Sequence, residues 1–298
     1  NVLAATLRSI GDSKTPLIFL IVSSILNIVM DIIFIVYFKM GVEGAAIATV
    51  IAEMFSCIFC MIYIYKKVPL LHFSKKEIVL DKFLLRNTIN YSWATAMQQT
   101  CLYVGKVIVQ AIVNPLGVDV IATFNAVNRV DDFAFTPQQS IGHAMTTFLA
   151  QNRGAKKYER IKQGLWTGLK LETFYWCLIL VCTYFGARNI MQLFVTEDNS
   201  KVLELGVIYL QLMAFFYLLP AWTNGIQGYF RGMGELRVTL LSTFSQMVGR
   251  VVFAYFLAPR YGIVGIAVSC FFGWVIMLLY EVPIFIKHRK EHSIDIQA

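Results

Sequence analysis

Two polar residues lie four positions apart inside the first long apolar stretch of the chain. They are Asn27 and Asp31, and the next apolar stretch carries Thr49 and Glu53 at the same spacing. Residues four apart share one face of a helix. Carboxylate, amide and hydroxyl oxygens on such a face can bind a hard cation, and a carboxylate removed from water can carry a proton instead. We therefore predict a site for Na⁺ or H⁺ at Asn27, Asp31 and Thr49, with Glu53 as a further candidate.

The two stretches follow each other closely enough to form an antiparallel helical hairpin, so the depths of their residues can be compared. Counted from the outer end of the hairpin, Asp31 lies about 10 Å deep and Thr49 about 8 Å deep. Asn27 and Glu53 lie about one turn deeper. These depths predict contacts between Asp31 and Thr49 and between Asn27 and Glu53.

A second group of ionisable residues lies in the third and fourth apolar stretches. Such side chains cost about 2.5–3.5 kcal/mol at the centre of a membrane helix, so they need partners or a function. Two interpretations stay open: a self-neutralising ion-pair cluster, or the lining of a substrate cavity or relay. Glu281, by contrast, is expected near a helix end with its carboxylate reaching water. The group itself comprises Lys106, Arg129, Asp131 and Asp132.

The composition of the chain indicates which elements hold these residues. Its 298 residues are 57% hydrophobic and 15% charged, whereas soluble domains are about 25% charged. Apolar stretches of about 20 residues recur, each long enough to cross a bilayer as a helix. No stretch alternates like a strand. We predict an all-α polytopic membrane protein with eight transmembrane helices near residues 17–38, 44–65, 88–113, 120–149, 164–187, 203–230, 237–258 and 263–286.

Basic residues in the connecting segments predict the orientation of these helices. The connections after the second, fourth, sixth and eighth stretches are rich in Lys and Arg, and the alternate connections are poor in them. Positive residues mark the cytoplasmic side, so we expect both chain ends in the cytoplasm and the protein in the cell membrane. The net charge of +8 reflects these loops. No basic patch with interleaved aromatic residues predicts nucleic-acid binding.

Motifs of enzymes and metal proteins are not found. Cys57 and Cys60 form a CxxC, but all six cysteines lie in apolar runs, which is typical of small buried residues. The sequence has no HExxH motif, His-rich cluster or Ser/Lys pair on one face, and no filter-like loop of a channel. We predict a protein that is not an enzyme and has no cofactor and no metal site other than the candidate Na⁺ site.

The chain also contains an internal repeat. Arg8 and Gly11 correspond to Arg231 and Gly234, each pair before an apolar stretch, and a Gly-x-x-Gly turn follows at residues 41–44 and 262–265. Parallel helix repeats are common in transporters. Because four stretches precede the second copy, we expect four more helices before the first and about twelve in the intact protein.

This layout predicts the domains. Residues 1–65 form the end of an N-lobe with its last two transmembrane helices, 66–86 a cytoplasmic linker helix, 87–287 a C-lobe of six transmembrane helices, and 288–298 a cytoplasmic tail. The second copy does not duplicate the polar site. Arg250 falls at or near the place of Asn27, Cys270 corresponds to Thr49, and an apolar residue stands opposite Asp31. Cation coupling is therefore expected in the first lobe.

Two loops resemble those of multidrug and toxic compound extrusion (MATE) transporters. Residues 7–16, LRSIGDSKTP, are similar to the loop before the fifth helix of that family, and residues 151–160, QNRGAKKYER, to the loop after the eighth. The resemblance covers the whole chain as family helices five to twelve. It implies a monomeric two-lobe protein in the lipid bilayer that exports organic, often cationic compounds in exchange for H⁺ or Na⁺ by alternating access.

The resemblance also bears on the candidate site. In the DinF-like and archaeal branch of the family, the positions of Asn27, Asp31 and Thr49 form a cation site that an Asp on the first helix completes. An alternative is a flippase of lipid-linked oligosaccharide or peptidoglycan precursors from the same superfamily. Such flippases carry several basic residues in the central cavity, and the Asn27/Asp31 pair favours cation chemistry instead.

Overall fold

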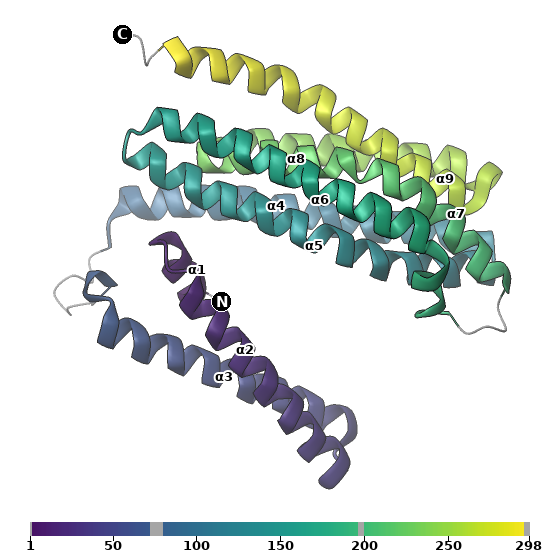
Figure 1. Ribbon diagram of the computed structural model, residues 1–298, viewed down its shortest axis with the longest axis horizontal. Coiled ribbons are helices and arrows are strands. Elements are labelled where there is room, and N and C mark those ends of the chain that lie inside the picture. The colour runs from purple at the N-terminus through teal and green to yellow at the C-terminus, as the bar shows by residue number, and fades with distance from the viewer. Residues whose placement is uncertain (1, 72–79, 196–199, 295–298) are drawn as a thin grey trace. The chain divides into compact units, whose positions relative to one another are not determined.

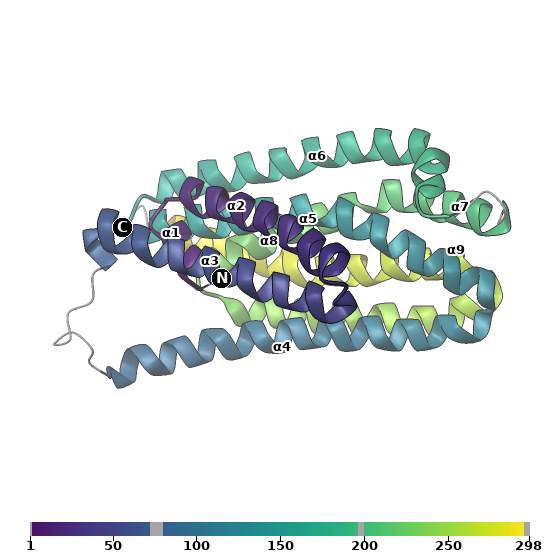
Figure 2. The same cartoon turned by 90° about the horizontal axis from the view of Figure 1, so that it is seen from below.

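Helices make up nearly all of the chain that the structure describes, which is a computed structural model of residues 2–71, 80–195 and 200–294. Figure 1 and Figure 2 show it from two directions. The elements are α1 (Val2–Ser9), α2 (Lys14–Asp31), the π-helix η1 (Ile32–Tyr37), α3 (Gly41–Lys67), the 3-10 turn η2 (Pro69–Leu71), α4 (Lys82–Val113), the 3-10 turn η4 (Asn114–Leu116), α5 (Val118–Gly154), α6 (Tyr158–Gln192), α7 (Ser200–Phe216), α8 (Leu218–Gly232) and α9 (Leu236–Ile294).

Several helices are long and apolar enough to cross a bilayer. Among the described residues, four segments meet that standard, and α7 with α8 forms a fifth if the bent pair is one span. Large apolar side chains such as Leu20, Ile28 and Phe55 are exposed on α2 and α3, which suits contact with lipid. The chain is an all-α polytopic membrane protein. The four segments are Lys14–Tyr37, Gly41–Lys67, Tyr158–Gln192 and Leu236–Lys290.

Each of the eight predicted stretches is helical, with one feature that the sequence analysis did not predict. The stretch 203–230 is bent by 44° between α7 and α8. Pro220, in the first turn of α8, has no N–H to continue the ladder from α7. α9 contains both of the last two predicted helices, which a kink at the non-helical Gly262 (φ 55°, ψ −130°) separates within the predicted gap between 258 and 263.

The chain divides into two compact units, residues 1–82 and 83–298. The boundary falls inside the predicted linker 66–86, but the described part of that segment is not one continuous helix. α3 ends at Lys67, a 3-10 turn follows at Pro69–Leu71, and Leu80 and Asp81 are not helical; residues 72–79 lie outside the described residues. At the other end, α9 continues to Ile294, into the segment predicted as a tail.

Unit 1 is a helical hairpin in which α2 and α3 pack along each other. The reversal between them is tight, because Lys39 and Gly41 both have positive φ, at 56° and 58°. Gly44 lies just inside α3, and a Cβ on it would come within 2.9 Å of the Phe34 Cβ. This close approach holds the two helices together at the turn.

Unit 2 is a bundle in which α5 packs along α6, α7 and α8, and α8 packs on α9. Its long helices run in a common direction in both views (Figure 1 and Figure 2). α5 and α8 meet backbone to backbone, since a Cβ on Gly228 would lie 2.7 Å from the Gly142 carbonyl oxygen. Small residues at a helix interface permit such an approach.

The backbone supports the sequence repeat. The paired glycines Gly11 and Gly234 both have positive φ, 96° and 78°, and so do Gly41 and Gly262, at 58° and 55°. The last glycines of the two Gly-x-x-Gly turns share a different property. A Cβ on Gly265 would meet the Leu257 carbonyl oxygen at 2.5 Å, which is a contact as close as the one at Gly44. In both copies, glycine is thus needed for a positive φ at the first position of the turn and for a close contact at the last.

The cysteines differ from the prediction of uniform burial. Cys60 and Cys270 are buried, whereas Cys57, Cys177 and Cys182 are exposed. The exposed ones lie on helix faces that turn away from neighbouring helices of the same unit. Within the described residues no group of three or more His, Cys, Asp or Glu side chains could hold a metal ion.

Candidate functional site

The predicted polar residues of unit 1 face one another across the hairpin. The Asn27 Nδ2 donates to the Thr49 Oγ1 at 3.4 Å, and the Thr49 hydroxyl donates to the Ala45 carbonyl at 2.9 Å. One turn earlier on α2, the Ser23 hydroxyl donates to the Ala52 carbonyl at 2.8 Å. The Asn27–Thr49 and Ser23–Ala52 bonds hold α2 and α3 in a defined register, whereas the Thr49–Ala45 bond lies within α3.

That register differs from the predicted one by about one helical turn. Asn27 meets Thr49, whereas the sequence analysis expected Asp31 to meet Thr49 and Asn27 to meet Glu53. The cause is the start of α3 at Gly41, three residues before the predicted span. Three residues shift Thr49 about 4.5 Å further from the turn, past the depth of Asp31 and toward that of Asn27. Glu53 is exposed and lies a turn beyond that contact.

Asp31 keeps an unused carboxylate oxygen. Its Oδ1 is buried and accepts no hydrogen bond within the described part of the chain, while the residue as a whole is half-buried. A buried carboxylate oxygen without a donor is unfavourable unless a cation or proton joins it. Asn27, one turn away on the same face, uses its amide nitrogen toward Thr49 and leaves its carbonyl oxygen for a second ligand bond. The donor set therefore fits a hard cation or a proton.

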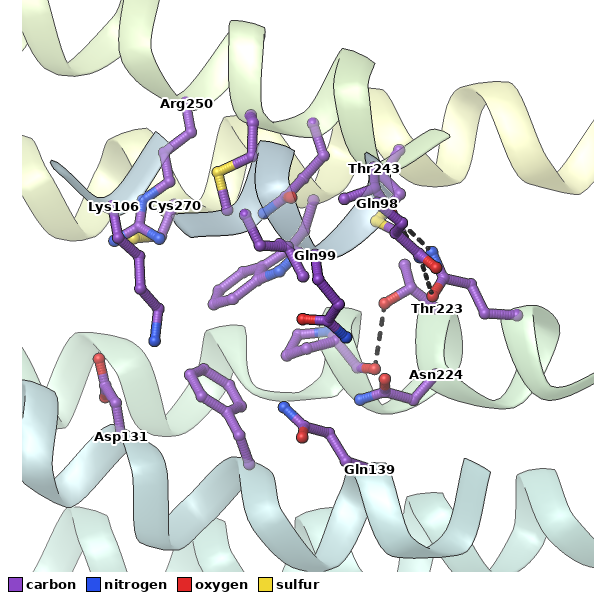
Figure 3. Close-up of a pocket in the computed structure, with 18 of the residues that line it drawn as sticks. Gln98, Gln99, Lys106, Asp131, Gln139, Thr223, Asn224, Thr243, Arg250 and Cys270 are labelled. Atoms are coloured by element: carbon purple, nitrogen blue, oxygen red, sulfur yellow. Dashed lines mark hydrogen bonds between the residues drawn. The ribbon is translucent and has the colours of Figure 1, made fainter. Parts of the chain in front are cut away.

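Unit 2 encloses a cavity of about 380 Å³. α4, α5, α8 and α9 line it, with Met213 of α7 at one wall (Figure 3). Amide side chains contribute neutral hydrogen-bonding groups, and Phe135 and Trp274 contribute aromatic faces. The amides include Gln98, Gln99, Gln139 and Asn224.

Three of the four charged residues predicted as a group line this cavity, but they do not form one cluster. Lys106 pairs with Asp132 at 3.7 Å, and both side chains are more than half exposed. Asp131, the preceding residue, is buried at the cavity wall, where the Tyr209 and Tyr217 hydroxyls donate to it at 3.0 and 2.5 Å. Arg129 is exposed and does not line the cavity. The structure therefore contains an ion pair, between Lys106 and Asp132, and a cavity that Lys106, Asp131 and Asp132 line. Arg129 belongs to neither.

A buried polar network joins α4, α8 and α9. The Gln98 amide donates to the Gln227 Oε1 at 3.2 Å and to the Thr243 hydroxyl at 2.8 Å, and the Gln227 amide donates to the Glu281 Oε1 at 3.2 Å. Arg231 also donates to the Gln227 Oε1, at 2.7 Å. Glu281 is 0% exposed, so the expectation that it reaches water was wrong. Its position on α9 faces α8 and not the end of the bundle.

Two further charged residues were not predicted as site residues. Arg250 lines the cavity, and its Nε is buried without a partner in the described residues. Glu172 of α6 is 0% exposed, and neither of its carboxylate oxygens has a partner there. Both lie inside apolar runs, and an ionisable residue in such a run is itself a signal of function. That signal could have identified them.

Comparison with known proteins places the chain in a family. The family model MatE matches residues 94–256, more than half of the 298-residue chain. The chain belongs to the MatE family. A second model, "Lipid II flippase MurJ", matches residues 1–114 of this MatE protein.

Two curated relatives and one solved structure illustrate the similarity. "Probable multidrug resistance protein YoeA" of Bacillus subtilis is 28% identical over 96% of this chain and 64% of its own length. "Probable multidrug resistance protein YpnP" of the same organism is 27% identical over 90% of this chain and 60% of its own. A crystal structure of "MATE in complex with MaL6" superposes with a TM-score of 0.91 at 19% identity, over 100% of this chain and 67% of that one. The MatE chain thus spans roughly three-fifths of these relatives.

Proposed function

We propose that this MatE protein is a secondary active antiporter of the cell membrane that exports organic, often cationic compounds in exchange for H⁺ or Na⁺ by alternating access. The proposal concerns transport and no catalytic reaction. It places both ends of the chain in the cytoplasm and the protein in the bilayer as a monomer. The names of two relatives as multidrug resistance proteins support the class of cargo.

The observation that carries the coupling proposal is the polar site of unit 1. Asp31 has a buried oxygen without a donor, and Asn27 and Thr49 are hydrogen-bonded beside it. In this proposal the cation or proton binds at Asp31 with the Asn27 carbonyl oxygen, and the Asn27–Thr49 bond holds that oxygen in place. Glu53, which is exposed one turn beyond Thr49 on α3, is a second carboxylate for cation entry.

The test is Asp31→Asn in the protein expressed from its complete coding sequence and reconstituted in proteoliposomes. Efflux of a fluorescent organic cation is measured with a Na⁺ gradient alone and with a pH gradient alone. We expect the variant to insert and to lose gradient-driven efflux under whichever gradient drives the wild type. Glu43→Gln, which removes a carboxylate from the exposed first turn of α3, is the control and should keep efflux. Unchanged efflux in Asp31→Asn would refute the coupling site.

A second candidate function is the flipping of lipid-linked precursors. The match of residues 1–114 to the MurJ model favours it. Proteoliposomes that contain a fluorescent undecaprenyl-diphosphate lipid decide between the two candidates. Movement of this lipid between leaflets, without efflux of organic cations, would support the flippase and contradict the exporter.

A further inference from the structure

The cavity of unit 2 has more positive than negative side chains in its lining. The lining includes the basic residues Lys106, Arg231 and Arg250 and the acidic residues Asp131 and Asp132. Such a cavity is unusual for a cargo site that would serve cations alone. The question is which of these charges is free to meet a ligand.

Both acidic residues are already engaged by the protein. Each Asp131 oxygen accepts a hydrogen bond from a tyrosine hydroxyl, Oδ2 from Tyr209 and Oδ1 from Tyr217. Asp132 forms the ion pair with Lys106. Both acidic residues of the lining therefore have partners within the protein, and the Asp131 charge also acts on Arg250 without forming an ion pair with it.

Arg250 is in the opposite situation. In the described part of the chain it forms no ion pair, and its buried Nε has no acceptor. Figure 3 shows its side chain reaching from α9 into the cavity, as Lys106 does from α4. Arg250 is half-buried, lines the cavity and keeps a buried Nε without an acceptor among the described residues. Such a guanidinium can bind a carboxylate or phosphate through two parallel hydrogen bonds.

The internal repeat gives independent support. Arg250 stands at or near the position of Asn27, and Cys270 at that of Thr49. Arg250 and Cys270 both line the cavity, whereas Asn27 and Thr49 meet across the hairpin of unit 1. The same place in the two copies therefore carries a ligand for cations in unit 1 and a fixed cation in unit 2.

We propose that the unit 2 cavity binds an organic anion or zwitterion, with the carboxylate or phosphate group at Arg250. Gln99 and Asn224 hydrogen-bond the polar parts of the molecule, and Phe135 and Trp274 pack on its apolar body, while Lys106 stays paired with Asp132. The proposal rests on the proposed transport function and refines its cargo, because it adds an anionic group to the compounds that the protein carries.

The test compares two dyes that differ by one charge, rhodamine B with its free carboxylate and rhodamine B ethyl ester. Binding to the purified full protein is measured by fluorescence polarisation in neutral detergent. We expect the free acid to bind at least about tenfold more tightly, the effect of one charge-assisted hydrogen bond. Arg250→Gln should abolish this preference. Arg129→Gln removes the same charge from an exposed position outside the cavity and should preserve it.

Competition on the wild-type protein tests the proposal even if Arg250→Gln does not fold. 1-Naphthoate should displace bound rhodamine B, and 1-naphthylmethylammonium should not. Equal binding of acid and ester, a preference that survives in a monodisperse Arg250→Gln protein, or displacement by the cation alone would each overturn the proposal. These binding measurements are made at equilibrium, so they do not depend on gradient-driven efflux. If the protein prefers rhodamine B to its ester but shows no efflux, only the proposed transport is contradicted.

The anionic group could also belong to a lipid. Binding is therefore repeated in nanodiscs of phosphatidylcholine and of phosphatidylglycerol. Retained binding of rhodamine B in both supports a soluble substrate. If rhodamine B binds in phosphatidylcholine nanodiscs but not in phosphatidylglycerol nanodiscs, the anionic lipid competes with the dye, which supports a lipid phosphate at the same Arg250 site.

Discussion

The Asn27 Nδ2 lies 3.4 Å from the Thr49 Oγ1, and this contact sets the register of α2 against α3. The bond uses the amide nitrogen and leaves the amide oxygen, on the helix face that Asn27 shares with Asp31, for another contact. It also keeps Thr49 away from Asp31, whose buried Oδ1 has no donor in the described residues. The register therefore leaves the carboxylate available to a cation or proton.

Replacing Thr49 tests the importance of this register. Thr49→Val keeps the shape but removes the acceptor for Asn27, so the amide oxygen is no longer held beside Asp31. A hydrogen bond of about 0.5–1.5 kcal/mol predicts an apparent affinity for the coupling ion that is about 2–12-fold weaker. The measurement is the ion dependence of efflux in proteoliposomes. Thr49→Ser retains the hydroxyl and should behave as wild type; equal effects of Val and Ser would contradict the role of the bond.

Replacing Glu281 tests the buried network. The Gln227 amide donates to it at 3.2 Å, and Arg231 is close enough to interact with it electrostatically. Glu281→Ala leaves a buried donor without an acceptor, so we expect the free energy of unfolding to fall by about 1–3 kcal/mol. Thermal unfolding of the protein in detergent measures this. Glu281→Gln keeps an acceptor oxygen and should lower the free energy of unfolding by less. A larger decrease in Glu281→Gln than in Glu281→Ala would be inconsistent with the network.

Replacing Glu172 should raise the stability of the protein, in contrast to replacing Glu281. This carboxyl is fully buried on α6, and neither oxygen has a partner in the described residues. Leucine has a similar volume and no polar atoms, so Glu172→Leu should raise the unfolding midpoint by removing an unsatisfied polar group, a gain of about 1–3 kcal/mol. Thr173→Val, the adjacent position, removes the acceptor for the Trp222 indole N–H and should lower the midpoint. A lower midpoint in Glu172→Leu would mean that the carboxyl has a stabilising partner.

Asp12 predicts a dependence of stability on pH. Hydrogen bonds from Thr15, and a further one from the Tyr63 hydroxyl, hold the pKa of Asp12 below its ordinary value of 3.8. A lowered folded-state pKa means that the stabilisation is present above pH 3.8 and is lost as pH falls through the lower folded value. Asp12→Ala also removes an acceptor at the start of α2, a loss of about 0.5–2 kcal/mol at neutral pH.

The measurement for Asp12 is the difference in unfolding midpoint between wild type and Asp12→Ala at neutral and at acidic pH. We expect the difference to be largest at neutral pH and to shrink once the carboxylate is protonated. A difference that stays constant with pH would show that the charge of Asp12 contributes nothing.

Alanine at Gly228 tests the backbone contact between α5 and α8. A Cβ at this position would lie 2.7 Å from the Gly142 carbonyl oxygen, so the helices must move apart. We expect a loss of about 1–3 kcal/mol in stability. Gly154→Ala is a matched control at the end of α5, where a Cβ meets nothing within 4 Å. If the two variants unfold at the same temperature, the contact does not determine the packing.

The fold could be predicted where a local signal exists. Apolar stretches located all eight helical segments, and the paired glycines identified the turns. The bend between α7 and α8 was missed, although Pro220 was visible, because a proline in the first turn of a helix also occurs without a bend. The start of α3 at Gly41 was placed three residues late, and this small error gave Thr49 the wrong predicted partner, Asp31 in place of Asn27.

The site could be predicted only as a set of candidates. Asp131 and Asp132 are adjacent in sequence, yet one is bonded to two tyrosines and the other to Lys106. Consecutive residues on a helix point about 100° apart, and the sequence does not state which of them faces the core. Tyr209 and Tyr217 come from α7 and its junction with α8, so their approach to Asp131 depends on packing that no local pattern encodes.

The contact between Gly142 and Gly228 has a consequence for how this protein can diversify. Because main chain rests on main chain there, the distance between α5 and α8 does not depend on the size of the side chains that point into the cavity. Substitutions at lining positions such as Gln139 or Asn224 can therefore alter which molecules are accepted without altering the spacing of the walls. A change in the molecules that the cavity binds would then need changes in the lining alone, while the spacing of α5 and α8 stays the same.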